Sequence, residues 1–74
     1  MKYTISDRTG AGQTLAQITA NTYEEAADRW TTRQYGRHLV AHRVTGTHGK
    51  SGCFQAYQSV PSGSSTFGEQ FHVS

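Results

Sequence analysis

Residues Asn21–Gly36 read NTYEEAADRWTTRQYG, and this stretch has the clearest helical pattern in the chain. Thr22 suits the N-cap position, because its hydroxyl can accept from free backbone N–H groups of the first turn. Glu25, three residues later, completes a capping-box pattern. Gly36 suits the position just after a helix, where positive φ is common. We therefore predict a helix that begins after Thr22 and ends before Gly36.

One face of this helix is apolar. Spacing at i, i+3, i+4 and i+7 places side chains on one side of a helix, and four residues follow it: Tyr23, Ala26, Ala27 and Trp30. The two alanines allow a sheet to approach closely, and Trp30 supplies a large surface for burial. We predict that Trp30 lies in the core.

The rest of the chain has the patterns of strands and turns. Alternating residues predict a hairpin of Lys2–Asp7 and Gln13–Ala20 across the turn Asp7–Gly12, with Ile18 and Leu15 on opposite faces. Glycine, proline and serine clusters predict turns or flexible loops after the helix. Three further strands are expected there, at Arg37–Thr45, Cys53–Val60 and Phe67–Val73. The turn Gly46–Gly52 joins the first two strands, and the loop Pro61–Thr66 joins the last two.

The order strand, strand, helix, strand, strand, strand predicts the fold class. Its simplest solution is a single α+β domain over residues 1–74, in which one antiparallel sheet of four to five strands carries the helix on one face. One helix leaves the other face open, which antiparallel sheets tolerate. The pattern of Arg37–Thr45 does not decide which of its faces is buried. An open face carrying Tyr57, Arg43 and several histidines is a candidate docking surface.

Composition limits how this domain can be stabilised. The chain has 74 residues, of which 34% are hydrophobic, so its core is thin. One cysteine excludes an internal disulfide, and no Cys/His cluster predicts a zinc site. A partner or a homo-oligomer is the remaining source of support. No run has the length of a transmembrane helix or a signal-peptide core, which favours a soluble intracellular protein.

Charge is distributed unevenly along the chain. Residues 1–28 hold four of the five acidic residues, whereas residues 29–50 hold five cations and no acid. Such asymmetry is typical of a binding face, although a solvated basic surface is the plain alternative. With one exposed aromatic side chain added, the candidate partner-binding residues are Arg29, Arg33, Arg37, Arg43, Lys50 and Tyr57.

Three motifs suggest chemistry, but each has a simpler interpretation. Gly49-Lys50-Ser51 ends like a phosphate-binding loop, yet that motif requires glycine where Val44 stands. His38 and His42 would lie roughly 13 Å apart on a strand, too far to share a metal ion. Cys53 is more simply a small buried thiol than a nucleophile. We predict no enzyme activity, no metal and no cofactor.

In size and layout the chain resembles small anti-CRISPR proteins of phages and mobile elements, which inhibit type I CRISPR surveillance complexes. The resemblance is one of architecture: N-terminal strands, one helix that opens in TYEEAADRW, and strands to the C-terminus. It implies a non-enzymatic inhibitor in the cytoplasm of a bacterial host, which docks on a CRISPR effector complex and blocks target-DNA binding. It carries no catalytic residues, and the basic content argues against mimicry of DNA, since DNA mimics are acidic.

Two functions therefore stay open at the level of the sequence. One is a protein-binding inhibitor or adaptor. The other is a small nucleic-acid-binding module that uses the basic segment 29–50, with arginines on phosphates. The sequence does not identify the partner, the oligomeric state or the role of Cys53 and the histidines.

Overall fold

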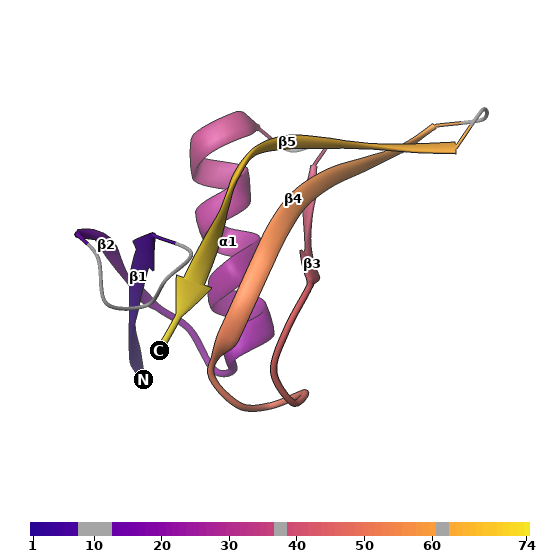
Figure 1. The fold of residues 1–74 in the computed structure, drawn as a ribbon. Helices are drawn as coiled ribbons and strands as arrows, with labels where there is room; N and C mark the ends of the chain where they lie inside the picture. Colours follow the sequence, from indigo (N-terminus) through magenta and orange to yellow (C-terminus); the bar gives the residue numbers. More distant parts are fainter. Residues whose placement is uncertain (8–12, 37–38, 61–62) are drawn as a thin grey trace.

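The computed structural model describes the backbone of residues 1–7, 13–36, 39–60 and 63–74, and their side chains except at 59, 60, 63–65 and 67. The elements follow the predicted order (Figure 1). They are β1 (Lys2–Asp7), β2 (Thr14–Thr19), α1 (Tyr23–Tyr35), β3 (Val40–Arg43), β4 (Gly52–Val60) and β5 (Gly63–Val73).

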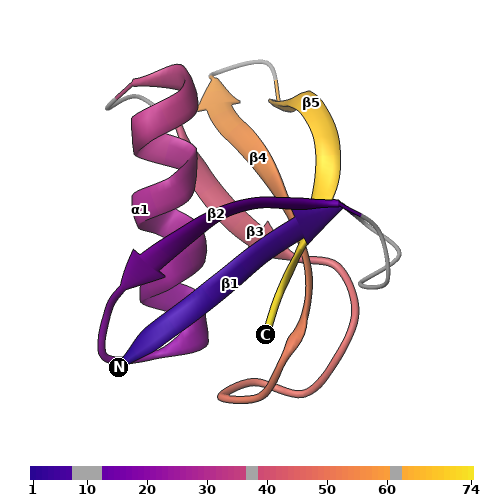
Figure 2. The same cartoon turned by 90° about the vertical axis from the view of Figure 1, so that its left-hand side faces the viewer.

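The five strands form one sheet in the order β2-β1-β5-β4-β3, and every neighbouring pair is antiparallel. The last strand of the chain thus lies between β1 and β4 and joins the N-terminal hairpin to the rest. α1 packs on one face of the sheet (Figure 2), where it contacts β1, β2, β3 and β5. The predicted α+β class, with one sheet and one helix, is confirmed.

The ends of α1 are formed as the sequence predicts. The Thr22 hydroxyl accepts a hydrogen bond of 3.0 Å from the backbone N–H of Glu25. At the other end Gly36 has φ +105°, and its N–H donates to the carbonyl of Thr32 at 2.9 Å. A positive φ is easily adopted by glycine, so both ends of the helix are determined by local residues.

The predicted apolar face of α1 is also confirmed. Ala26, Ala27 and Trp30 are buried, and Tyr23 packs at the margin of the core. The ring of Trp30 meets Phe71 edge-on, with the ring centroids 6.4 Å apart. Thr31 is completely buried beside them, which the apolar pattern did not predict because threonine is polar.

The sheet side of the core comes from the inward-facing residues of β1, β5 and β4 and from one residue of the edge strand β2. They are Tyr3, Ile5, Ile18, Phe54, Phe71 and Val73, and all are buried. Phe54 and Phe71 face each other across β4 and β5 with their rings stacked at 6.1 Å. The small core predicted from composition is therefore one layer between α1 and the sheet.

Two predicted segments differ from the structure. β3 occupies only Val40–Arg43 of the strand predicted at 37–45, and residues 37–38 lie outside the described part. The predicted loop Pro61–Thr66 is wrong over its last four residues, because β5 begins at Gly63 and pairs with β4. Backbone pairing across a hairpin holds a Gly- and Ser-rich stretch in a strand, despite its low strand propensity. Residues 8–12 of the predicted turn and residues 61–62 of the predicted loop lie outside the described residues.

Among the described residues, no helix combines the length and the hydropathy needed to cross a membrane.

Candidate partner-binding site

The structure distributes the predicted binding residues over separate places. Arg29 and Arg33 lie on α1 beside a groove. Lys50 is exposed on the turn between β3 and β4, and Tyr57 lies on the face of the sheet opposite the helix. Arg37 lies outside the described residues. The described members of this set therefore do not form one continuous basic face.

Arg43 is the predicted binding residue whose surroundings differ most from expectation. The sequence placed it on the open face with Tyr57, but Arg43 pairs with Phe54 on the helix side of the sheet. Its guanidinium lies 4.6 Å from the centroid of the Phe54 ring. Its Nε and Nη2 donate to Glu24 Oε2 at 2.9 and 2.5 Å. The side chain is only 15% exposed, because it spans from β3 to the start of α1.

The same guanidinium holds the glycine-rich turn between β3 and β4. Arg43 donates to the carbonyls of Thr45 at 3.2 Å and Lys50 at 2.7 Å. Gly46 has φ +92°, and a Cβ there would lie 2.6 Å from the Ser51 carbonyl and 2.9 Å from Arg43 Nη1. The segment that resembles a phosphate-binding loop is thus a turn folded around an internal arginine, and glycine leaves room for it.

Glu24, in the first turn of α1, forms an ion pair with Arg43. Besides Arg43, the backbone N–H of Gly49 donates to Glu24 Oε2 at 3.2 Å. Burial raises the pKa of Glu24, but the hydrogen bonds from Arg43 and Gly49 outweigh burial and hold the pKa below its ordinary value of 4.5. The carboxylate form of Glu24 therefore stabilises the folded state.

This shift predicts a pH dependence of stability. Because the pKa is lower in the folded state, the contribution of Glu24 is complete above the unfolded value near 4.5 and is lost as the pH falls through the folded value. Urea unfolding at decreasing pH should show a shallower loss of stability in Glu24→Gln than in the wild type. The exposed Glu69→Gln is the matched control for loss of one carboxylate, and it should follow the wild-type slope. Equal slopes for all three proteins would contradict the prediction.

The open face of the sheet carries a small hollow of about 190 Å³ around Tyr57. His42 meets the Tyr57 ring edge-on at 5.4 Å, and Gln55 and Thr66 complete the lining. Cys53, the one cysteine of the sequence, is buried and lies in register with His72 across β4 and β5. Within the described ranges, no three His, Cys, Asp or Glu side chains lie close enough together to hold a metal ion.

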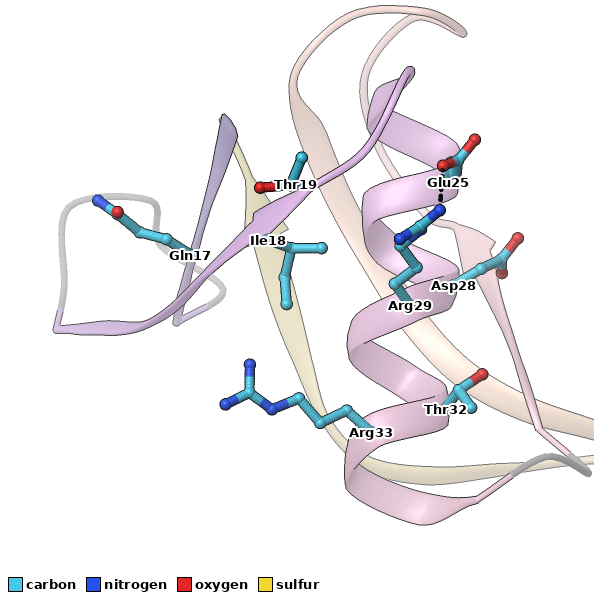
Figure 3. A pocket seen from close by; sticks show the side chains of 8 residues that line it. All are labelled: Gln17, Ile18, Thr19, Glu25, Asp28, Arg29, Thr32 and Arg33. Atoms are coloured by element: carbon cyan, nitrogen blue, oxygen red, sulfur yellow. Dashed lines mark ion pairs between the residues drawn. The ribbon is translucent and has the colours of Figure 1, made fainter. Parts of the chain in front are cut away.

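A larger groove of about 580 Å³ runs between β2 and α1 (Figure 3). Ile18 supplies apolar lining from the strand, with Gln17 and Thr19 on either side of it. The helix contributes one face from Glu25 to Arg33, which includes Arg29. The groove thus has an edge strand on one side and two acids and two cations of the helix on the other.

The charged side chains beside this groove differ in whether they already have a partner within the protein. Arg29 pairs with Glu25 at 3.0 Å, and in Figure 3 this pair lies along the helix. Asp28 points toward β3, where its Oδ1 accepts from the Ala41 N–H at 2.8 Å. Arg33 extends toward β2, and no hydrogen bond or ion pair among the described residues engages its guanidinium. Among the described residues beside the groove, Arg33 is therefore the cation that is available to bind an acidic group.

Sequence reasoning identified the helical side of the groove and missed its strand side. Charge clustering singled out Arg29 and Arg33, whereas Gln17, Ile18 and Thr19 were treated only as hairpin residues. The available signal was the composition of TLAQIT, a strand with no charged residue and no proline. Such a strand would have been informative only with knowledge that it lies at the edge of the sheet.

Comparison with models of protein families finds no match to this chain, and comparison with curated proteins finds none either.

Proposed function

We propose that this chain is a non-catalytic protein-binding module, which acts by occupying part of its partner's surface. The observation that carries the proposal is the open groove between β2 and α1, with the apolar Ile18 in its lining and, at its side, Arg33, which no described residue pairs with. A concave site with apolar lining and a few placed polar groups is the usual form of a specific binding site. The thin core is consistent with a protein that gains stability from its partner.

The resemblance to type I anti-CRISPR proteins suggests which partner to test first. Under this proposal the chain inhibits a CRISPR surveillance complex in the cytoplasm of a bacterial host, and it prevents target DNA from binding. A formal net charge of +2 favours obstruction of a protein surface over imitation of DNA, because a mimic of the phosphate backbone carries negative charge.

The alternative, nucleic-acid binding through residues 29–50, has less support. Arg29 is paired with Glu25, and Arg43 is held by Glu24 within the fold. Each such pair removes a cation from those that can neutralise phosphates. Salt-dependent affinity needs several free cations on one surface, and the described residues of this segment do not provide them.

A binding experiment with a purified type I surveillance complex tests the proposal. We expect a stoichiometric complex by size-exclusion chromatography that survives nuclease treatment and shows reduced binding of target DNA. Arg33→Glu should weaken the complex by about tenfold or more, as expected for loss of a charge-assisted contact and gain of repulsion. Lys50→Glu changes the net charge equally on a surface away from the groove, and it should bind like the wild type.

Two outcomes would contradict this role. One is an interaction that nuclease abolishes and whose affinity falls by roughly one log-log unit with salt per phosphate contact, which would indicate a nucleic-acid module. The other is an unchanged complex in Arg33→Glu together with a weakened one in Lys50→Glu, which would move the interface to the turn between β3 and β4.

A further inference from the structure

β2 is an edge strand: among the described strands it pairs only with β1, at one end of the five-stranded order. Its outer side therefore carries backbone groups that no described strand pairs with. Met1 and Ala20 exchange hydrogen bonds of 3.0 and 2.9 Å, so the backbone groups of Ala20 point toward the N-terminal strand. Backbone groups alternate in direction along a strand. Those of Ile18 therefore also point toward β1, and those of Gln17 and Thr19 point outward into the groove.

The opposite edge of the sheet is protected. β3 lies against α1, and the Asp28 carboxylate accepts from the outward N–H of Ala41 at 2.8 Å. A side chain from the helix thus occupies the position that a further strand would need. Proteins commonly block sheet edges in such ways, since a bare edge pairs with other chains.

β2 has none of these protective features. Its residues, TLAQIT, include no charge and no proline, and Leu15 on this strand is 48% exposed. An open groove lies between this strand and α1, so a chain segment can approach the outward backbone groups of β2. One edge is closed by the fold and the other is left accessible.

Building on the protein-binding role, we propose that β2 takes an added strand: an extended segment of the partner protein pairs with its free edge and places a carboxylate on Arg33. The backbone groups of Gln17 and Thr19 supply the strand hydrogen bonds, and the groove receives the segment's alternate side chains. Recognition of this kind draws affinity from the main chain and specificity from the pockets beside it.

The lining of the groove holds two acids and two cations, and it is the position of Arg33 that favours an acidic partner segment over a second copy of this chain. If two copies paired through β2, each would offer the other the sequence TLAQIT, which has no carboxylate for Arg33. An acidic residue in a foreign strand, by contrast, meets the guanidinium of Arg33, which is unpaired within the described part of the chain. Arginine forms strong hydrogen bonds with carboxylates.

Selection of random linear peptides against the folded protein provides the test. We expect enriched peptides to contain Asp or Glu, and replacement of that residue by Asn or Gln should weaken binding about tenfold or more. Gln17→Pro removes an outward N–H while leaving the bonds of β2 to β1, because proline is tolerated on the free side of an edge strand. This variant and Arg33→Glu should each lose binding, whereas Lys50→Glu should retain it.

Amide hydrogen exchange in the wild type gives a second measurement that does not depend on how well Gln17→Pro folds. The N–H groups of Gln17 and Thr19 should exchange fast in the free protein and become protected when an enriched peptide binds. Unprotected amides in the complex, or enriched peptides without acidic residues, would overturn the proposal. So would a concentration-dependent dimer that protects the same amides without peptide, because the occupant would then be a second copy.

Binding of the variants to the surveillance complex distinguishes failure of the strand-addition proposal from failure of the proposed protein-binding function. If the complex binds Gln17→Pro and Arg33→Glu as it binds the wild type, strand addition is wrong and protein binding stands. If the acidic peptides bind and no protein complex forms with the surveillance complex, that partner is wrong and the peptide site stands.

Discussion

Trp30→Ala is expected to lower the free energy of unfolding by about 3–5 kcal/mol, the usual range for loss of a buried tryptophan. Trp30 is only 9% exposed and packs on Phe71 in the single core layer. A domain of 74 residues has a total stability of about 4–11 kcal/mol. The substitution therefore removes a large share of the stability, and much of the protein should be unfolded at neutral pH.

Urea unfolding followed by circular dichroism measures this effect, because the variant lacks the fluorescent tryptophan. Tyr35→Ala is the matched control, an aromatic residue at the exposed end of the same helix. It should cost about 1 kcal/mol or less, as surface substitutions usually do. If the two variants were equally stable, Trp30 would not be the main link between α1 and the sheet.

The helix could be predicted from sequence because its determinants are local. Thr22, Trp30 and Gly36 act within a few residues of one another, and each has the role in the structure that its spacing predicted. The N-terminal hairpin was predictable for the same reason, since alternation in β1 and β2 needs no knowledge of the distant chain.

The orientation of β3 depended on contacts that sequence does not show. Both of its faces have similar patterns, and the choice is made by packing against α1 and β4. Leu39 is buried, whereas Val40 is 46% exposed although it is equally apolar. Arg43 then lies on the helix side because Glu24, nineteen positions earlier in the chain, is there to pair with it.

The candidate site was half predictable by the same argument. The cations of α1 form a sequence cluster, so Arg33 was named in advance. Gln17 and Thr19 gain their significance only from the strand order, which inserts β5 between β1 and β4 and leaves β2 at the edge. The strand order depends on the pairing of β1 with β5, which are far apart in the sequence, so no local pattern predicts it.

Arg43→Ala is expected to cost about 1–3 kcal/mol, because it leaves the half-buried Glu24 carboxylate without its charged partner. The same change removes the donors to the Thr45 and Lys50 carbonyls and exposes the Phe54 ring. Destabilisation should therefore extend to the turn between β3 and β4, where faster amide exchange of Gly49 would report it. Arg43→Lys keeps the charge but cannot reach the same set of acceptors, so its cost should be smaller but measurable.

A double-mutant cycle with Glu24→Gln isolates the ion pair from the other contacts of Arg43. The coupling free energy between the two positions should be about 1–3 kcal/mol, the range for residues in one hydrogen-bond network. The exposed pair of Arg29 and Glu25 provides the comparison, with a coupling below about 0.5 kcal/mol at its helical i,i+4 spacing. Equal coupling in both cycles would mean that burial adds nothing to the Arg43 pair. The glycine-rich turn would then be held by backbone geometry instead of by the arginine at its centre.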